Sequence, residues 1–183
     1  MKKFDTKELT VLGILTAIVI VLQTTIHIRF GMFSISTVLV PIVIGSALYG
    51  VFAGAWLGLV FGIAVLLSGD AAFFLGMTIP GTIFTVLAKG VLSGIVSALI
   101  YRKLEWKNPK AAVLCAAVAA PVVNTAAFIL LVRIIFSRFA PEYGSIFTII
   151  GMVVGLNFVV ELIINVVLSS AMVFLIRYAR RMH

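Results

Sequence analysis

Six long apolar segments dominate this sequence, and they restrict what kind of fold the chain can adopt. Their approximate boundaries are 9–26, 36–49, 52–68, 82–101, 111–136 and 146–177. A helix needs about 20 mostly apolar residues to cross a bilayer. Hydrophobic residues make up 63% of the chain and charged residues only 11%, so a soluble fold would have too little polar surface. The sequence therefore predicts an all-α integral membrane protein, a six-helix bundle in one transmembrane domain over residues 1–183. It excludes soluble enzymes and nucleic-acid-binding domains.

The basic residues are unevenly distributed between the connections. If every segment crosses the membrane, 10 of the 14 Lys and Arg residues share one side with both termini. These are Lys2, Lys3, Lys7, Arg102, Lys103, Lys107, Lys110, Arg177, Arg180 and Arg181. Basic loops are retained on the cytoplasmic side. We therefore predict a cell-membrane protein with both termini in the cytoplasm.

The connections on the opposite side are longer. They cover 27–33, 69–80 and 137–144 and contain polar, aromatic, Gly and Pro residues. Long connections more often carry function than short turns do. This pattern favours a binding site that opens to the outside.

Several polar residues interrupt the apolar segments. A charge in the hydrocarbon costs about 2.5 kcal/mol or more, so each one requires an explanation. Lys89 lies within 82–101, Asn124 follows Pro121 within 111–136, and Asn157, Glu161 and Asn165 are spaced to share one helical face. Two main interpretations remain open: a structural Lys89–Glu161 ion pair with asparagines bonding neighbouring helices, or a polar cavity that binds a ligand. Snorkelling of the charge to a headgroup is a third.

The 69–80 connection supplies two further candidates. Asp70 is either a binding residue or an ordinary loop residue. Phe73 and Phe74, with Gly69 and Gly76 around them, suit a lid over a ligand or an anchor at the interface.

Glycines recur in the second and third segments. Gly45, Gly50, Gly54, Gly58 and Gly62 follow one another at spacings of four or five residues. Small residues at such spacings let membrane helices approach closely. We interpret these glycines as packing residues, and we give the same role to the single cysteine, Cys115.

Motifs for catalysis or metal binding are missing from the sequence. It contains no HExxH, GxSxG or P-loop pattern and no pair of adjacent acids. We predict neither a catalytic residue nor a cofactor or metal. A chain without a nucleotide-binding loop also cannot hydrolyse ATP itself.

Three stretches resemble a known family. The run 41–58, PIVIGSALYGVFAGAWLG, is similar to the second-to-third helix hairpin of the substrate-binding S component of energy-coupling factor (ECF) transporters. Residues 85–94 and 121–125 are similar to its fourth and fifth helices. The resemblance implies capture of a water-soluble vitamin outside the cell. It also implies that the chain lies in the lipid bilayer, that its protein partners are a transmembrane T subunit and two cytoplasmic ATPase subunits, and that it binds no nucleic acid.

The resemblance also implies a docking surface. Family members dock on the T subunit through Ala-x-x-x-Ala on the first helix, and this chain has Gly13 and Ala17 at that spacing. The alternatives from other classes are a self-sufficient small transporter or channel, and a membrane enzyme or assembly factor without a recognised motif.

The charges of the candidate site rank the vitamins. Lys89 and Arg133 against Glu161 leave a positive excess, which favours pantothenate. Riboflavin or a queuosine precursor follows, because a flat ligand could stack on phenylalanines. The candidates for stacking are Phe30, Phe33, Phe73 and Phe74.

Overall fold

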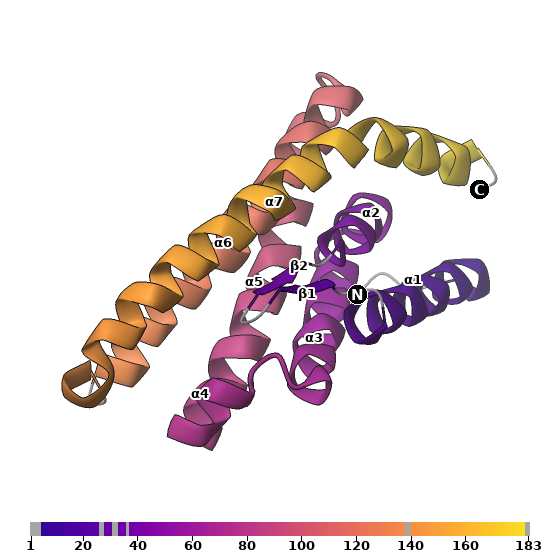
Figure 1. Cartoon of the computed structure of the whole chain (residues 1–183). Helices are drawn as coiled ribbons and strands as arrows, with labels where there is room; N and C mark the ends of the chain where they lie inside the picture. Colours follow the sequence, from indigo (N-terminus) through magenta and orange to yellow (C-terminus); the bar gives the residue numbers. More distant parts are fainter. Residues whose placement is uncertain (1–4, 26–27, 31–32, 36, 138–139, 182–183) are drawn as a thin grey trace.

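The computed structural model describes residues 5–25, 28–30, 33–35, 37–137 and 140–181, and side chains for 5–25, 37–137 and 154–181. The fold in this part is a helical bundle with one short hairpin (Figure 1). Its elements are α1 (Thr6–Thr24), β1 (Ile28–Phe30), β2 (Phe33–Ile35), α2 (Leu39–Tyr49), α3 (Val51–Ser68), α4 (Ala72–Met77), α5 (Ile79–Leu104), α6 (Pro109–Phe136) and α7 (Ala140–Arg181). The two strands pair antiparallel, with Arg29 opposite Ser34.

Five helices of the described part are long and apolar enough to cross a membrane. They are α1, α3, α5, α6 and the Val154–Arg181 part of α7. This agrees with the prediction of a helical membrane bundle. Helix α2 has 11 residues, and at 1.5 Å per residue it extends about 16 Å, roughly half of the hydrocarbon thickness.

Local sequence signals explain where several helices begin earlier than predicted. Asp5 caps α1 in a capping box with Glu8, so α1 begins at Thr6 instead of residue 9. Pro80 lies in the first turn of α5, where the missing N–H costs nothing. Asn108 accepts hydrogen bonds from the backbone N–H groups of Lys110 and Ala111 and starts α6. The predicted boundaries Ile26 and Ser36 lie outside the described residues.

The 69–80 connection, which we predicted as a loop, contains the short helix α4. Its start follows Gly69, which ends α3 with a φ of 82°. That left-handed conformation is easily adopted only by glycine. The connection is therefore an ordered helical turn packed on α5.

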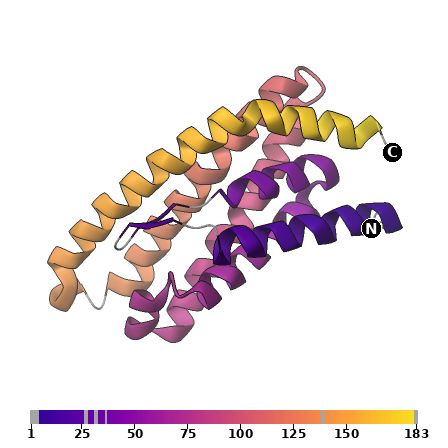
Figure 2. The same ribbon diagram turned by 45° about the vertical axis from the view of Figure 1, so that its right-hand side comes forward.

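The chain ends lie together at one end of the bundle. In Figure 2 the start of α1, the end of α7 and the turn between α5 and α6 lie at this end. The β1–β2 hairpin, α4 and the last turn of α6 lie toward the opposite end. The basic residues of 102–110 and the end of α7 thus gather at the end that holds both termini, as the sequence predicted.

Helices α3 and α5 cross at very close range. A Cβ at Gly54 would overlap the carbonyl oxygen of Gly94, and a Cβ at Gly58 would overlap that of Gly90. A Cβ at Gly62 would lie 3.0 Å from the Cα of Leu87. The packing role predicted for the glycines of α3 is therefore confirmed.

Gly50 has a different role from the one we predicted. A Cβ at Gly50 would meet nothing within 4 Å, and its φ of 81° places it in the left-handed region. It separates α2 from α3 through its conformation, not through packing. Cys115 also differs from the prediction, because it is exposed on α6 instead of buried.

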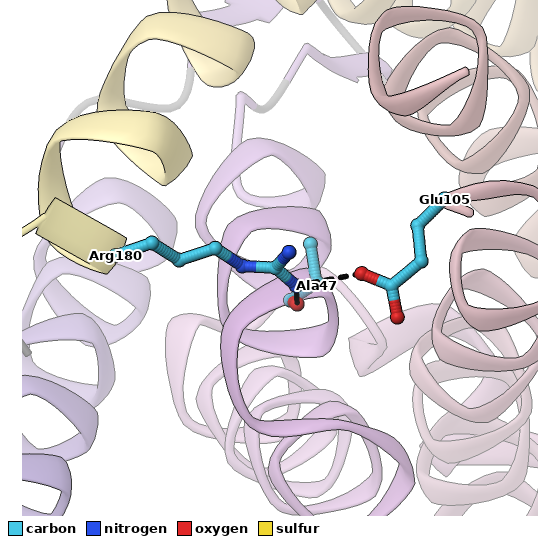
Figure 3. A network of polar contacts seen from close by, with 3 residues as sticks. All are labelled: Ala47, Glu105 and Arg180. Carbon is cyan, nitrogen blue, oxygen red and sulfur yellow. Dashed lines mark hydrogen bonds and ion pairs between the residues drawn. The ribbon is translucent and has the colours of Figure 1, made fainter. Parts of the chain in front are cut away.

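An arginine near the end of α7 joins three helices. Arg180 forms a 2.8 Å ion pair with Glu105, which follows α5, and donates to the Ala47 carbonyl of α2 at 3.2 Å (Figure 3). Its guanidinium also lies over the ring of Tyr101, 5.5 Å from the centroid. The last carbonyls of a helix lack partners within the helix, so Arg180 supplies a donor to the end of α2.

Candidate functional site

Lys89 lies on α5 between two aromatic rings. Its Nζ is 5.6 Å from the centroid of Phe61 on α3 and 5.0 Å from that of Phe128 on α6. The rings attract a cation through their quadrupoles. This arrangement holds the ammonium between three helices, and Lys89 as a whole residue is half-buried.

The structure rules out a direct ion pair between Lys89 and Glu161. Among the described residues, the ion pair that is formed joins Arg180 to Glu105, and no carboxylate lies within 4.0 Å of Nζ of Lys89. Of the two main interpretations, the structural ion pair is therefore wrong. An anionic ligand group could still complete the coordination of Lys89.

The polar residues of α7 share one face, as their spacing predicted. The side-chain amide of Asn157 donates to Oε1 of Glu161 at 3.2 Å, and that of Asn165 donates to the Glu161 backbone carbonyl at 2.8 Å. Glu161 is 4% exposed and Asn165 is fully buried. The three side chains form a polar stripe, which is buried at Glu161 and Asn165 and half-buried at Asn157.

Four buried acceptors near the middle of α6 and α7 lack a hydrogen-bond partner within the described part of the chain. They are Oδ1 of Asn124, Oδ1 of Asn157, Oε2 of Glu161 and Oδ1 of Asn165. An unsatisfied buried polar group costs about 1–3 kcal/mol. Each of these oxygens is an unused acceptor for a hydroxyl or amide donor of a ligand.

An aromatic cluster connects α4 with Lys89. The ring of Phe74 packs edge-to-face on Phe73, Phe128 and Phe136, with centroid distances of 5.3, 5.3 and 5.6 Å. Phe128 in turn covers Lys89. Phe73 thus lies one ring away from the site and does not itself contact Lys89. Sequence reasoning missed Phe61 and Phe128, since nothing in the pattern distinguishes them from other phenylalanines of the spans.

Asp70 is engaged in a structural contact. Its Oδ2 accepts from Nε2 of Gln23 at 2.6 Å and from the Ser68 hydroxyl at 3.0 Å. Gln23 is buried near the end of α1, so the contact ties α1 to the end of α3. Gln23 was also missed, although an amide within an apolar span is a visible signal.

Gly13 and Ala17 are exposed on one face of α1. Space is open at Gly13, where a Cβ would meet nothing within 4 Å. The neighbouring Ile14 and Ile18 are also exposed. This face of α1 is therefore apolar and has small residues at its centre. At Gly13 no other part of the described chain packs against it.

The remaining candidates do not join this site. Arg133 is exposed on the surface of α6. The side chains of Phe30 and Phe33 lie outside the described part of the structure. The structure thus joins Lys89 with Phe61 and Phe128 and, separately, Asn157 and Asn165 with Glu161, while Asn124 is a further buried polar residue on α6.

The chain is similar to known transport proteins over nearly its whole length. The pantothenic acid transporter PanT of Lactococcus lactis subsp. cremoris (strain MG1363) is 29% identical over 199 aligned residues, covering 98% of both chains. No solved structure matches the chain significantly. The model of the family "ECF transporter, substrate-specific component" matches residues 7–176. Because this match covers nearly the whole chain and agrees with its apolar helices, the protein belongs to the substrate-specific component family of ECF transporters.

Proposed function

We propose that this protein captures pantothenate outside the cell with high affinity and delivers it inward together with an ATP-driven energy-coupling module. The observation that carries the proposal is Lys89, a cation held by two aromatic rings with no carboxylate in ion-pair distance among the described residues. The name of the relative PanT supports the same ligand.

The chemistry of pantothenate matches Lys89 and the other candidate groups. Its carboxylate would form a charge-assisted hydrogen bond with the ammonium. Its two hydroxyls and its amide N–H are hydrogen-bond donors. The buried acceptor oxygens of Asn124, Asn157, Glu161 and Asn165 have no donor among the described residues. Its dimethyl group suits the aromatic surroundings of Phe61 and Phe128. Riboflavin or a queuosine precursor fits less well, because neither carries a carboxylate.

We further propose the topology and partners that this function needs. Both termini face the cytoplasm, in keeping with the basic residues gathered at their end of the bundle. The exposed face of α1 around Gly13 and Ala17 docks on a transmembrane T subunit, which is coupled to two cytoplasmic ATPases. The chain itself binds and does not catalyse.

Competition binding tests the ligand. Purified protein in detergent is incubated with radiolabelled pantothenate and excess unlabelled pantothenate, riboflavin or queuosine precursor. The proposal expects that only unlabelled pantothenate displaces the label. Displacement by riboflavin or the queuosine precursor would transfer the assignment to that compound. Failure of the label to bind would reject pantothenate.

Removing the buried acceptors is expected to weaken binding. Asn124→Ala and Glu161→Ala should each reduce pantothenate affinity by about 1–3 kcal/mol, because each removes a hydrogen bond to the ligand. Isothermal titration calorimetry measures the effect. Ser170→Ala, an exposed position on α7, is the matched control and should bind normally. Unchanged affinity in both test variants would exclude the two residues from the site.

Bulky residues on the α1 face should separate uptake from binding. Gly13→Leu and Ala17→Leu fill an exposed small-residue surface, so they should block close helix approach by a T subunit. We expect loss of pantothenate uptake by cells and unchanged binding by the purified variants. If binding is lost as well, the face is needed within the bundle and is not a docking surface.

A further inference from the structure

The corner between α5 and α6 carries a cluster of exposed cations. Arg102, Lys103, Lys107 and Lys110 lie within nine residues of each other, and all four are exposed. We name these four residues, with Trp106, the basic corner. It lies at the end of the bundle where the chain begins and ends (Figure 2), far along α5 from the residues around Lys89.

The charges of the basic corner are not neutralised by the described protein. Glu105 is the single acid in 102–110, and its carboxylate is held by Arg180 of α7 (Figure 3). No carboxylate of the described residues lies within ion-pair distance of the four cations. The corner therefore presents four exposed positive charges without a counter-ion among the described residues.

Trp106 gives the corner a side chain suited to the membrane interface. It is 76% exposed, its indole N–H donates to the Lys103 carbonyl at 2.9 Å, and Lys107 lies over its ring at 5.3 Å. Tryptophan favours the headgroup level of a bilayer, where its ring is apolar and its N–H is hydrogen-bonded. If this ring lies at the headgroup level, the lysines beside it are within reach of lipid phosphates.

The helices leading away from the corner provide an apolar surface. Leu99 on α5 is 51% exposed and Leu114 on α6 is 41% exposed. An acyl chain can pack on such side chains, while a free phosphate or a nucleotide would gain nothing from them. The combination of unpaired cations, an interfacial ring and exposed leucines matches an amphiphilic anion.

We propose that the basic corner binds an anionic glycerophospholipid, with the lipid phosphate on Lys103, Lys107 and Lys110 and an acyl chain beside Trp106. Binding is electrostatic at the headgroup, so it favours anionic over zwitterionic lipids and weakens with salt. This lipid site is separate from the proposed vitamin site.

Tryptophan quenching by brominated lipids tests the proposal. The chain has two tryptophans, so Trp56→Phe leaves Trp106 as the reporter. The variant is reconstituted in phosphatidylcholine containing increasing brominated phosphatidylglycerol, and in parallel brominated phosphatidylcholine. We expect quenching of Trp106 at about tenfold lower fractions of the anionic lipid. Equal quenching by both lipids would overturn the proposal.

Matched charge removal locates the effect. In the Trp56→Phe background, Lys107→Gln/Lys110→Gln should abolish the preference for phosphatidylglycerol. Lys7→Gln/Arg133→Gln removes the same charge elsewhere on exposed residues and should retain it. Loss in both pairs, or in neither, would contradict a site at this corner. A lipid site is also contradicted if Lys107→Gln/Lys110→Gln keeps the lipid preference but no longer assembles with the energy-coupling subunits. The corner would then bind protein instead of lipid.

Discussion

Replacing Lys89 with methionine is expected to weaken pantothenate binding by about 10- to 150-fold. The range follows from a charge-assisted hydrogen bond of about 1.5–3 kcal/mol. Methionine keeps the apolar length of the side chain between Phe61 and Phe128 but cannot pair with a carboxylate. Calorimetric titration of the purified variant with pantothenate measures the loss.

Pantothenol identifies which part of the ligand Lys89 recognises. This analogue carries a neutral alcohol in place of the carboxylate. The wild-type protein should bind pantothenol much more weakly than pantothenate, and the Lys89→Met variant should bind the two compounds about equally. If Lys89→Met still discriminates between the two compounds as the original protein does, another cation binds the carboxylate.

The thermal stability of Lys89→Met serves as the folding control. Lys89 has no ion-pair partner among the described residues, and a charge within a membrane span is costly. Its removal should leave the thermal midpoint in detergent unchanged or raised. A lowered midpoint together with lost binding would mean that the ammonium supports the fold instead of the ligand.

Gly94→Ala is expected to destabilise the bundle by about 3 kcal/mol, the upper part of the usual range for overpacking. A Cβ at this position overlaps the backbone of Gly54, not a movable side chain. The two helices must therefore separate along their crossing. Denaturant unfolding in detergent micelles, followed by circular dichroism, measures the change.

Gly155→Ala is the matched control for this substitution. Gly155 lies inside α7, and a Cβ there meets nothing within 4 Å. Alanine has the higher helix propensity, so this variant should be neutral or more stable by up to about 1 kcal/mol. If the two variants unfold alike, α3 and α5 do not pack backbone to backbone at Gly94.

The sequence was most informative where a regular spacing determines which residues share a face. The four-residue spacing of Asn157, Glu161 and Asn165 predicted the polar stripe of α7, and the structure confirms it with two hydrogen bonds. Gly54 and Gly58 likewise revealed a packing face. Their partners Gly90 and Gly94 could not be assigned, because helix pairing depends on tertiary contacts that spacing does not encode.

The surroundings of Lys89 show where sequence reasoning stops. An ion pair with Glu161 and a ligand site were both compatible with the sequence, because two charges within spans carry no information on their separation. The structure places Phe61 and Phe128 against the ammonium instead. Asp70 was equally ambiguous until its contacts with Gln23 and Ser68 were known.

Native mass spectrometry shows whether the protein captures pantothenate. The chain is purified in detergent from cells grown in rich medium, measured intact, and then denatured to identify any released small molecule. We predict a stoichiometric adduct that releases pantothenate. An empty protein that also fails to bind added pantothenate would contradict the claim, and release of another vitamin would replace pantothenate as the substrate.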